Sequence, residues 1–203
     1  MHRICKQLLR DFKDFYLKPD AKIDILDIGS CDFNGNIKSL FQDNTNWSYM
    51  GADIRAGENV DVLMHSDYDW RIPNTYDLII SSNTMEHVND VKLWIQQIPS
   101  LLTPGGLVCI DVPFFHGLHR SPERDCWRFL PDGLRWLLVD ICQLEMIDTF
   151  YYTNDCIGIA RDTRTLSNDR FNDEALKIKP RGFRGDFRGN FLDLTFDELQ
   201  YKR

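Results

Sequence analysis

Residues 25–35 read ILDIGSCDFNG, and residues 49–54 read YMGADI. In the first stretch an apolar run reaches an acid, Asp27, and then a turn that begins with Gly29. In the second, another apolar run ends in Asp53. An α/β sheet builds a nucleoside site in this way, because glycine lets the backbone approach the ligand and the second acid accepts hydrogen bonds from ribose hydroxyls. The two stretches therefore predict a strand, a helix and a second strand around a nucleoside cofactor.

The chain on either side of this unit alternates between expected strands and expected helices. The strands are predicted over residues 22–28, 47–54, 60–64, 76–82, 107–112, 143–150 and 155–160, and the helices over 3–17, 36–43, 90–102 and onward from Pro131. In the third helix we expect Asn89 as the N-cap, a kink or break at Pro99, and an end at residues 103–106. The alternation predicts an α/β fold with a doubly wound, mostly parallel sheet whose ligands bind at the carboxyl ends of the strands.

The 203 residues suit one domain with a single core. We expect that domain over residues 1–160, led by a helix within 1–19, and a polar extension over 161–203. Residues 181–189 of the extension read RGFRGDFRG, which fits a substrate lid, a nucleic-acid contact or a tail that packs its phenylalanines on the core.

Charge and cysteine usage narrow the class of protein. A net charge of −7 argues against general nucleic-acid binding, which needs a basic face. The six cysteines are scattered without CxxC or Cys/His metal spacing, so we read them as reduced and mostly structural. The N-terminus lacks an apolar core of signal-peptide length, and no apolar run approaches the ~20 residues that span a bilayer. We expect a cytoplasmic enzyme with no membrane partner.

Five short motifs follow one another along the chain: LDIGS at 26–30, GADI at 51–54, YDLI at 76–79, MEHV at 85–88 and LLTPGG at 101–106. In this order and spacing, over about residues 20–160, the chain resembles the class I methyltransferases that use S-adenosylmethionine. It is most similar to the small-molecule, type 11-like bacterial enzymes. Residues 122–131, PERDCWRFLP, look like a segment that recurs in one bacterial subgroup whose members are suspected of acting on sugars or other metabolites. The resemblance implies a Rossmann-like sheet of seven strands with helices on both faces.

Two positions depart from the family pattern. Cys31 stands where the second glycine of the turn is usual, so its side chain either crowds the methionine end of the cofactor or marks a wider loop. Leu130 precedes Pro131 where a capping Ser, Thr or Asp is favoured, and the missing cap costs on the order of 1 kcal/mol.

The resemblance implies S-adenosylmethionine as the cofactor and assigns residues to it. The cofactor-binding candidates are Asp27, Gly29, Ser30, Asp53, Ile54, Asp67 and Asn83. We expect Asp53 to bind the ribose hydroxyls and Asp67 either to meet the adenine amino group or to cap a loop. Asp27 either holds the ammonium group or fixes the turn. Asn83 lies beside the methyl-transfer centre, where it contacts cofactor or substrate.

The segment after the fifth strand is dense in His, Arg, acidic and aromatic residues, and we place the methyl acceptor there. The acceptor-binding candidates are His87, Arg120, Arg124, Trp127 and Arg128, and the candidate general bases are His116 and His119, with Asp125 next. The competing interpretation is an internal salt-bridge network that pins a long loop. For Glu86 a structural role is favoured. No metal is expected, because no compact His/carboxylate cluster is visible.

The sequence therefore predicts a methyltransferase that moves a methyl group to an O or N atom of a small, anionic or sugar-like metabolite. A nucleic-acid (RNA) methyltransferase and a non-catalytic binder of the cofactor are the alternatives. A dinucleotide oxidoreductase is disfavoured because the turn lacks GxGxxG spacing. Dimerisation through a sheet edge or the tail stays open.

Overall fold

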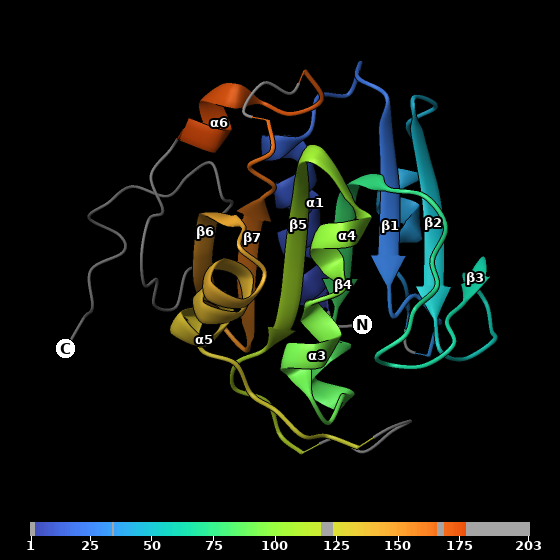
Figure 1. Ribbon diagram of the computed structural model, residues 1–203, viewed down its shortest axis with the longest axis vertical. Helices are drawn as coiled ribbons and strands as arrows, with labels where there is room; N and C mark the ends of the chain where they lie inside the picture. The colour runs from blue at the N-terminus through green and yellow to red at the C-terminus, as the bar shows by residue number, and fades with distance from the viewer. Residues whose placement is uncertain (1–2, 34, 119–123, 166–168, 178–203) are drawn as a thin grey trace.

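The computed structural model describes residues 3–33, 35–118, 124–165 and 169–177 (Figure 1). Within them the strands are β1 (Ile23–Ile28), β2 (Trp47–Asp53), β3 (Val62–Leu63), β4 (Tyr76–Ser82), β5 (Leu102–Pro113), β6 (Glu145–Tyr152) and β7 (Asp155–Arg161). The helices are α1 (Arg3–Tyr16), α2 (Lys38–Phe41), η1 (Met85–His87), α3 (Val91–Ile95), α4 (Ile98–Leu101), α5 (Pro131–Arg135), η2 (Trp136–Ile141) and α6 (Asp173–Lys177).

The seven strands form one sheet in the order β3-β2-β1-β4-β5-β7-β6. The first five strands pair in parallel, and β7 lies antiparallel between β5 and β6. The carboxyl ends of β1, β2, β4 and β5 therefore share one edge of the sheet, at the bottom of Figure 1. Because β7 is reversed, its first residue, Asp155, lies at that same edge, opposite Pro113 of β5. This confirms the predicted doubly wound, mostly parallel sheet.

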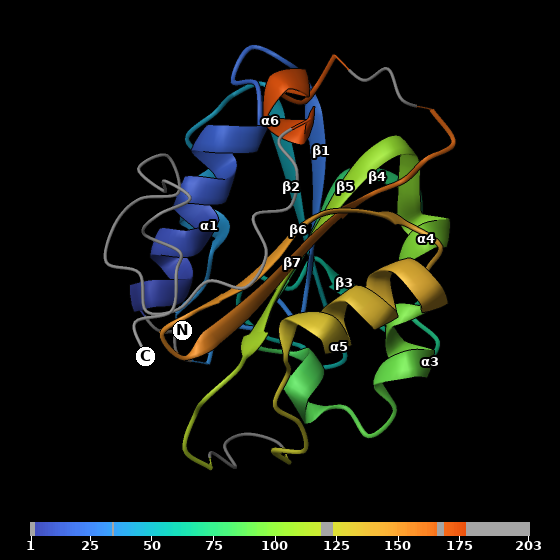
Figure 2. The same cartoon turned by 90° about the vertical axis from the view of Figure 1, so that its left-hand side faces the viewer.

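Helices cover both faces of the sheet, as Figure 2 shows, with α1 and α6 on one side and α3, α4 and α5 on the other. Strand residues alternate between the two cores. Ile25 and Leu78 pack with α1 and α2, whereas Leu26 and Ile79 pack with α3, α4 and α5. Burial on both faces explains why β4 is buried along its whole length.

The predicted helix over 90–102 is two short helices, α3 and α4. Its N-cap is Asp90 rather than Asn89, since the Asp90 side chain accepts hydrogen bonds from the backbone N–H groups of Lys92 and Leu93, both at 3.0 Å. The break falls at residues 96–97, and Pro99 lies in the first turn of α4, where its missing N–H costs nothing.

Several boundaries also differ from the sequence expectations. Strand β5 begins at Leu102, so residues 103–106 belong to the strand instead of closing a helix. Strand β3 has two residues rather than five, and α2 has four. The helix that begins at Pro131 lacks a side-chain N-cap, as expected, and continues as a π-helix over η2.

The chain beyond β7 returns to the α1 face as far as the structure describes it. Phe171 is fully buried, pairs with Leu17 in an isolated bridge, and leads into α6. The RGFRGDFRG stretch lies outside the described residues. All six cysteines lie within the described residues, and each is a free thiol. Among the described helices, none has the length and apolar character that a membrane crossing requires.

Candidate active site

The turn after β1 is held against the end of β2 by backbone hydrogen bonds. The N–H groups of Gly29 and Ser30 both donate to the Ala52 carbonyl, at 2.8 and 3.2 Å. Gly29 has a φ of +84°, and a Cβ at this position would overlap the Thr84 side chain. The position therefore requires glycine on two independent grounds, backbone conformation and close approach.

Ser30 is buried and directs its hydroxyl away from the open edge. Its Oγ donates to the Asn59 carbonyl at 3.0 Å. Space for this contact exists because residue 51 is glycine; a Cβ there would lie 2.7 Å from Ser30 Oγ. The donor of the Ser30 hydroxyl and its backbone N–H are thus both used within the protein, and the hydroxyl keeps acceptor capacity.

Cys31 is accommodated by a second glycine far from it in the sequence. A Cβ at Gly57 would lie 2.5 Å from Cys31 Sγ, so the thiol occupies the space that Gly57 leaves open. The Cys31 N–H donates to Asp53 Oδ2 at 3.1 Å. The structure places the Cys31 side chain toward Gly57 in the β2–β3 connection.

Asp53, at the end of β2, is buried and held by backbone donors on both oxygens. Cys31 N–H binds Oδ2, and Arg55 N–H binds Oδ1 at 2.9 Å. Each carboxylate oxygen can accept a further hydrogen bond, so the fixed carboxylate keeps acceptor capacity for two hydroxyls. Ile54 follows directly and is 36% exposed, an apolar surface beside the acid.

Asp67 is brought close to Asp53 by the short strand β3. It is half-buried, and its pKa is raised by burial first and next by the charge of Asp53. Its backbone carbonyl accepts from the Trp70 indole at 2.9 Å and from the Gln97 amide at 3.2 Å, which fixes the loop. Two predicted cofactor residues thus lie at the same edge of the sheet.

Asp27 points into the α1 and α2 side of the sheet. It is buried, and the Tyr49 hydroxyl donates to its Oδ2. Burial raises the pKa of Asp27 to about 7, partly offset by the Tyr49 hydrogen bond. This hydrogen bond joins β1 to β2, just before the turn.

Asn83 follows β4 in a left-handed conformation with a φ of +52°. Its backbone N–H donates to the Asp111 carbonyl at 2.8 Å. Its amide nitrogen lies 3.3 Å from Cys5 Sγ and 3.5 Å from Asp111 Oδ2. The side chain therefore faces α1 and β5, between the cofactor half and the acceptor half of the edge.

The segment where the sequence predicts acceptor binding, residues 113–130, is called the acceptor segment, and backbone and side-chain contacts tie it to η1. The Cys126 N–H donates to the Glu86 carbonyl at 2.9 Å, and the Trp127 indole donates to the Val88 carbonyl at 2.7 Å. His87 Nδ1 lies 2.6 Å from the Arg124 carbonyl oxygen. The structure thus places His87 as a support of this loop.

Arg128 and Asp125 form a bidentate pair inside the same loop. Arg128 also donates to the carbonyls of His116 and Gly117, each at 3.1 Å, and the Asp125 side chain is fully buried. This is the salt-bridge network that the sequence left as the competing interpretation. Arg124, by contrast, is exposed and donates to Asn89 Oδ1 at 3.1 Å. His119 and Arg120 lie outside the described residues.

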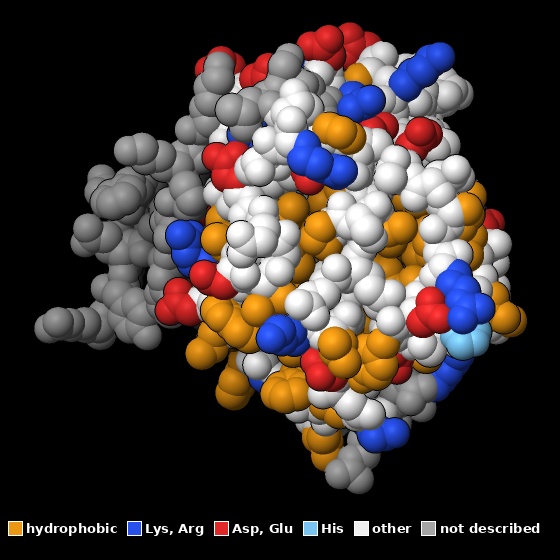
Figure 3. Space-filling model, in the orientation of Figure 1, with side chains coloured by type: hydrophobic (Ala, Val, Ile, Leu, Met, Phe, Trp, Pro, Cys, Tyr) orange, Lys and Arg blue, Asp and Glu red, His pale blue; other side chains and the backbone are white. Residues whose placement is uncertain are grey.

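Exposed apolar side chains gather around the acceptor segment. Phe115, Leu118, Leu130 and Trp127 are 77, 69, 60 and 41% exposed. Figure 3 shows hydrophobic side chains over α3, α5 and this loop, with Lys and Arg among them. The acceptor half of the edge therefore offers ring-sized apolar surface beside a cation.

Two buried acids were not assigned to the site from the sequence. Glu86 is fully buried, and burial raises its pKa to about 8. Asp111 is fully buried in β5 and accepts from Ser82 Oγ at 2.7 Å. The sequence did hold one signal for Asp111, an acid within the apolar run of a strand buried on both faces.

The strand order, the glycine turn and the acid at the end of β2 define a nucleotide-type cofactor site of the Rossmann-like kind. A family model described as a methyltransferase domain matches residues 1–140. The chain belongs to this family and is an S-adenosylmethionine-dependent class I methyltransferase.

Solved structures with the same fold include two methyltransferases of low sequence identity. A 1,6-didemethyltoxoflavin-N1-methyltransferase from Burkholderia thailandensis, with bound 1,6-didemethyltoxoflavin and S-adenosylhomocysteine, is 15% identical with a TM-score of 0.60, over 79% of this chain and 77% of that one. An S-adenosylmethionine-dependent methyltransferase from Aquifex aeolicus is 12% identical with a TM-score of 0.57, over 77% and 90%. No curated protein matches the chain significantly.

Proposed function

We propose that this methyltransferase acts on an O or N atom of a small, anionic or sugar-like metabolite that binds against residues 113–130. The observation that carries the proposal is the combination at that loop of an exposed cation, Arg124, with the exposed rings of Trp127 and Phe115. Guanidinium groups favour carboxylate and phosphate, and aromatic faces favour sugars and planar rings. The Burkholderia relative carries a small-molecule acceptor together with the cofactor product, which supports this class of acceptor.

The residues at the turn fit the cofactor. We assign the ribose hydroxyls to Asp53, the adenine to Ile54 and Asp67, and the methionine end to the backbone at Gly29 and Ser30. The overlap that a Cβ at Gly29 would cause and the fixed Asp53 carboxylate are the features that suit such a ligand. S-adenosylmethionine, when bound, supplies a methyl group already activated by its sulfonium charge.

The chain's own contribution to the reaction is then orientation, exclusion of water and removal of a proton. Orientation of the acceptor atom can remove several kcal/mol of barrier. We assign the acceptor's anionic group to Arg124 and its ring to Trp127. His116 is the general base that we favour among the described residues, because Asp125 is committed to Arg128.

Two alternatives remain to be separated from this proposal. An RNA methyltransferase would need a basic face, and the net charge of −7 and the acids at the carboxyl edge oppose it. A cofactor-binding protein without transferase activity would share every feature of the turn, since a site rather than a fold determines activity.

The first experiment is calorimetric binding of S-adenosylmethionine, S-adenosylhomocysteine and NAD to the wild type and to Asp53→Ala. Hydrogen bonds to a charged group contribute roughly 1.5–3 kcal/mol, so the variant should lose about ten-fold or more in affinity for the sulfur nucleosides. The exposed Asp43→Ala is the matched control and should bind as the wild type does. Unchanged affinity in Asp53→Ala would refute our placement of the ribose.

The second experiment screens acceptors by the release of S-adenosylhomocysteine. Anionic sugars and small carboxylates are compared with their neutral analogues and with RNA. Arg124→Ala should raise KM for an anionic acceptor about ten-fold and leave cofactor affinity unchanged, whereas the exposed Arg135→Ala in α5 should change neither. Turnover on RNA with a steep salt dependence would favour the first alternative, and cofactor binding without any turnover the second.

A further inference from the structure

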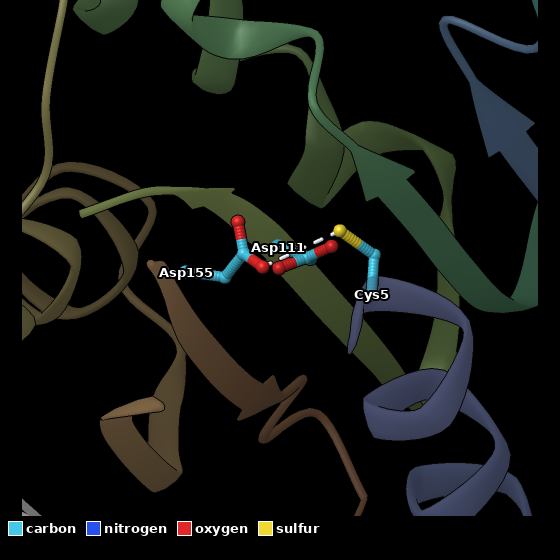
Figure 4. A group of neighbouring side chains, drawn as sticks. All are labelled: Cys5, Asp111 and Asp155. Carbon is cyan, nitrogen blue, oxygen red and sulfur yellow. Dashed lines mark hydrogen bonds between the residues drawn. The ribbon is translucent and has the colours of Figure 1, made fainter. Parts of the chain in front are cut away.

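A thiol and two carboxyl groups meet in the interior at the carboxyl edge of the sheet, outside the residues assigned to the cofactor and the acceptor. Cys5 comes from α1, Asp111 from β5 and Asp155 from the start of β7 (Figure 4). One ligand-type atom from each residue lies within 4.8 Å of the other two. All three residues are buried, with exposures of 0, 0 and 1%.

The hydrogen bonds within this group are incomplete at Asp111. Cys5 Sγ donates to Asp155 Oδ2 at 3.4 Å, and Ser82 Oγ donates to Asp111 Oδ2 at 2.7 Å. Asp111 Oδ1 is buried and has no hydrogen-bond partner among the described residues. Figure 4 shows the Asp111 carboxyl lying between the Cys5 sulfur and the Asp155 carboxyl, so the unpartnered oxygen belongs to a group aimed into the cluster.

Buried acidic groups so close together need a positive partner or retained protons. Burial, and next the charge of Asp155, raise the pKa of Asp111 to about 8. In the described part of the chain, neither Asp111 nor Cys5 forms a hydrogen bond or an ion pair with a Lys or Arg side chain. A cation held between them would offset the cost of burying the negative charge and would satisfy Asp111 Oδ1.

We propose that Cys5, Asp111 and Asp155 bind a divalent transition-metal ion, of which zinc fits the ligands best. A thiolate favours zinc over magnesium or calcium, which take oxygen ligands only. Zinc–sulfur and zinc–oxygen distances of about 2.3 and 2.0–2.2 Å place neighbouring ligand atoms roughly 3.5 Å apart. The distance from Cys5 Sγ to Asp155 Oδ2 is already 3.4 Å. Cys5, Asp111 and Asp155 are spaced too widely along the chain to form a recognisable motif.

The neighbouring Asn83, which the sequence places among the cofactor-binding candidates, would supply the fourth ligand atom with its side chain. Its amide nitrogen lies 3.3 Å from Cys5 Sγ and 3.5 Å from Asp111 Oδ2. A half-turn of the amide exchanges this nitrogen for Oδ1, an oxygen acceptor. A metal ion bound by these four residues would link α1 to β5 and β7. It would also fix the position of Asn83, which follows β4 beside the proposed methyl-transfer centre.

The test is the metal content of the full chain. Because the site is buried, the metal must enter during folding, so the protein is unfolded in chelator and refolded with zinc or cobalt, then dialysed. We expect about one metal ion per chain and, with cobalt, a thiolate-to-cobalt charge-transfer band. A wild-type protein that refolds to its native circular dichroism without metal would overturn the proposal and leave a protonated cluster.

Two variants and a matched control locate the ion. Cys5→Ser should abolish the charge-transfer band and reduce bound metal at least ten-fold, and Asp155→Asn should reduce bound metal while keeping the thiol. Cys142→Ser removes another buried thiol, on the opposite face of the sheet, and should keep both metal and band. Metal retained in Cys5→Ser, or lost equally in Cys142→Ser, would contradict the site. Calorimetry with S-adenosylhomocysteine runs in parallel, so this result stands apart from the acceptor assignment.

Discussion

The loops on the cofactor half and on the acceptor half of the sheet edge are held in different ways. The cofactor-side turn is held by backbone groups, with Gly29 and Ser30 N–H on the Ala52 carbonyl and Cys31 N–H on Asp53. The acceptor loop also has backbone hydrogen bonds to η1, but it adds side-chain contacts, above all the pair of Arg128 with Asp125. A backbone-fixed loop needs glycines and strand-end acids at set positions, whereas a side-chain-fixed loop can be built from many residue combinations. The first half therefore suits a common cofactor, and the second half can vary with the acceptor.

The largest expected effect comes from removing Arg128, whose pair with Asp125 holds the acceptor loop. Arg128→Ala removes the bidentate partner of the buried Asp125 carboxylate, which costs about 3 kcal/mol. We expect hydrogen exchange at the Cys126 and Trp127 amides to speed up at least ten-fold, because both donate to the Glu86 carbonyl in the same loop. Exchange at Gly29 and Ser30 should be unchanged.

The control for this variant is Arg161→Ala, which breaks the surface pair with Glu145 at 2.6 Å. That pair should be worth less than about 1 kcal/mol. Equal acceleration of exchange in the two loop regions of Arg128→Ala would show that they are coupled and would remove the contrast between them.

The contribution of Asp27, just before the cofactor-side turn, to the free energy of unfolding should depend on pH. The pKa of Asp27 is raised from an ordinary 3.8 to about 7 by burial. Because the folded pKa exceeds the unfolded one, the stability from this group is fully present below about pH 4 and is lost as the pH rises toward 7. Asp27→Asn cannot ionise, so relative to the wild type it should gain about 2 kcal/mol between pH 5 and pH 8 in urea unfolding.

Asp24→Asn is the matched control for that experiment, because Asp24 lies on the same strand at an exposed position. It should follow the wild-type pH profile. An Asp27→Asn profile parallel to that of the wild type would mean that the buried carboxyl does not titrate in this range.

The backbone requirement at the turn can be measured with two glycine variants. Gly29→Ala should lose about 2 kcal/mol of unfolding free energy, because the residue has a φ of +84° and its Cβ would overlap Thr84. Gly133→Ala lies in α5 with open space around the new Cβ and should gain about 0.5–1 kcal/mol. Chemical denaturation of the two variants gives both values, and a tolerated Gly29→Ala would refute the close approach.

The smallest expected effect tests whether the absence of a side chain at Gly57 makes room for the Cys31 thiol. Gly57→Ala places a Cβ 2.5 Å from Cys31 Sγ and should cost under about 1 kcal/mol in the wild type, since the thiol can rotate. In a Cys31→Gly background the same change should cost less, and a double-mutant cycle on unfolding free energy measures the coupling. A coupling of zero would show that Cys31 and Gly57 are independent.

The strands and most helices could be predicted because each rests on local pattern. Residues 76–82 are apolar throughout, and the structure buries all of them in β4. The sequence predicts a helix over 90–102 with Asn89 as its N-cap and a kink or break at Pro99, whereas the N-cap is Asp90 and the break falls at residues 96–97. Strand β5 includes residues 103–106, which local pattern assigns to a turn. They lie between the Tyr76–Leu102 and Leu78–Leu107 pairs with β4, where the register shifts.

The residues of the candidate site likewise divide into those that local pattern predicts and those that depend on distant segments. Asp53 and Gly29 were assigned from the sequence, because a strand-end acid and a turn glycine are required by local geometry. Three contacts could not be assigned from the sequence. They are the choice of Asp125 as the partner of Arg128, the space that Gly57 leaves for Cys31, and the hydrogen bond of Tyr49 to Asp27. Each of these joins residues by packing across elements.

The sequence alone therefore determined the order of strands and helices, the turn for the cofactor and the acid that closes it, since hydrophobic period and glycine positions are local properties. Tertiary structure decided which charged groups pair in the acceptor loop and which buried acids and thiol meet at the carboxyl edge. The physical reason is that burial and pairing of polar groups depend on residues brought together only when the sheet and its two helical layers pack.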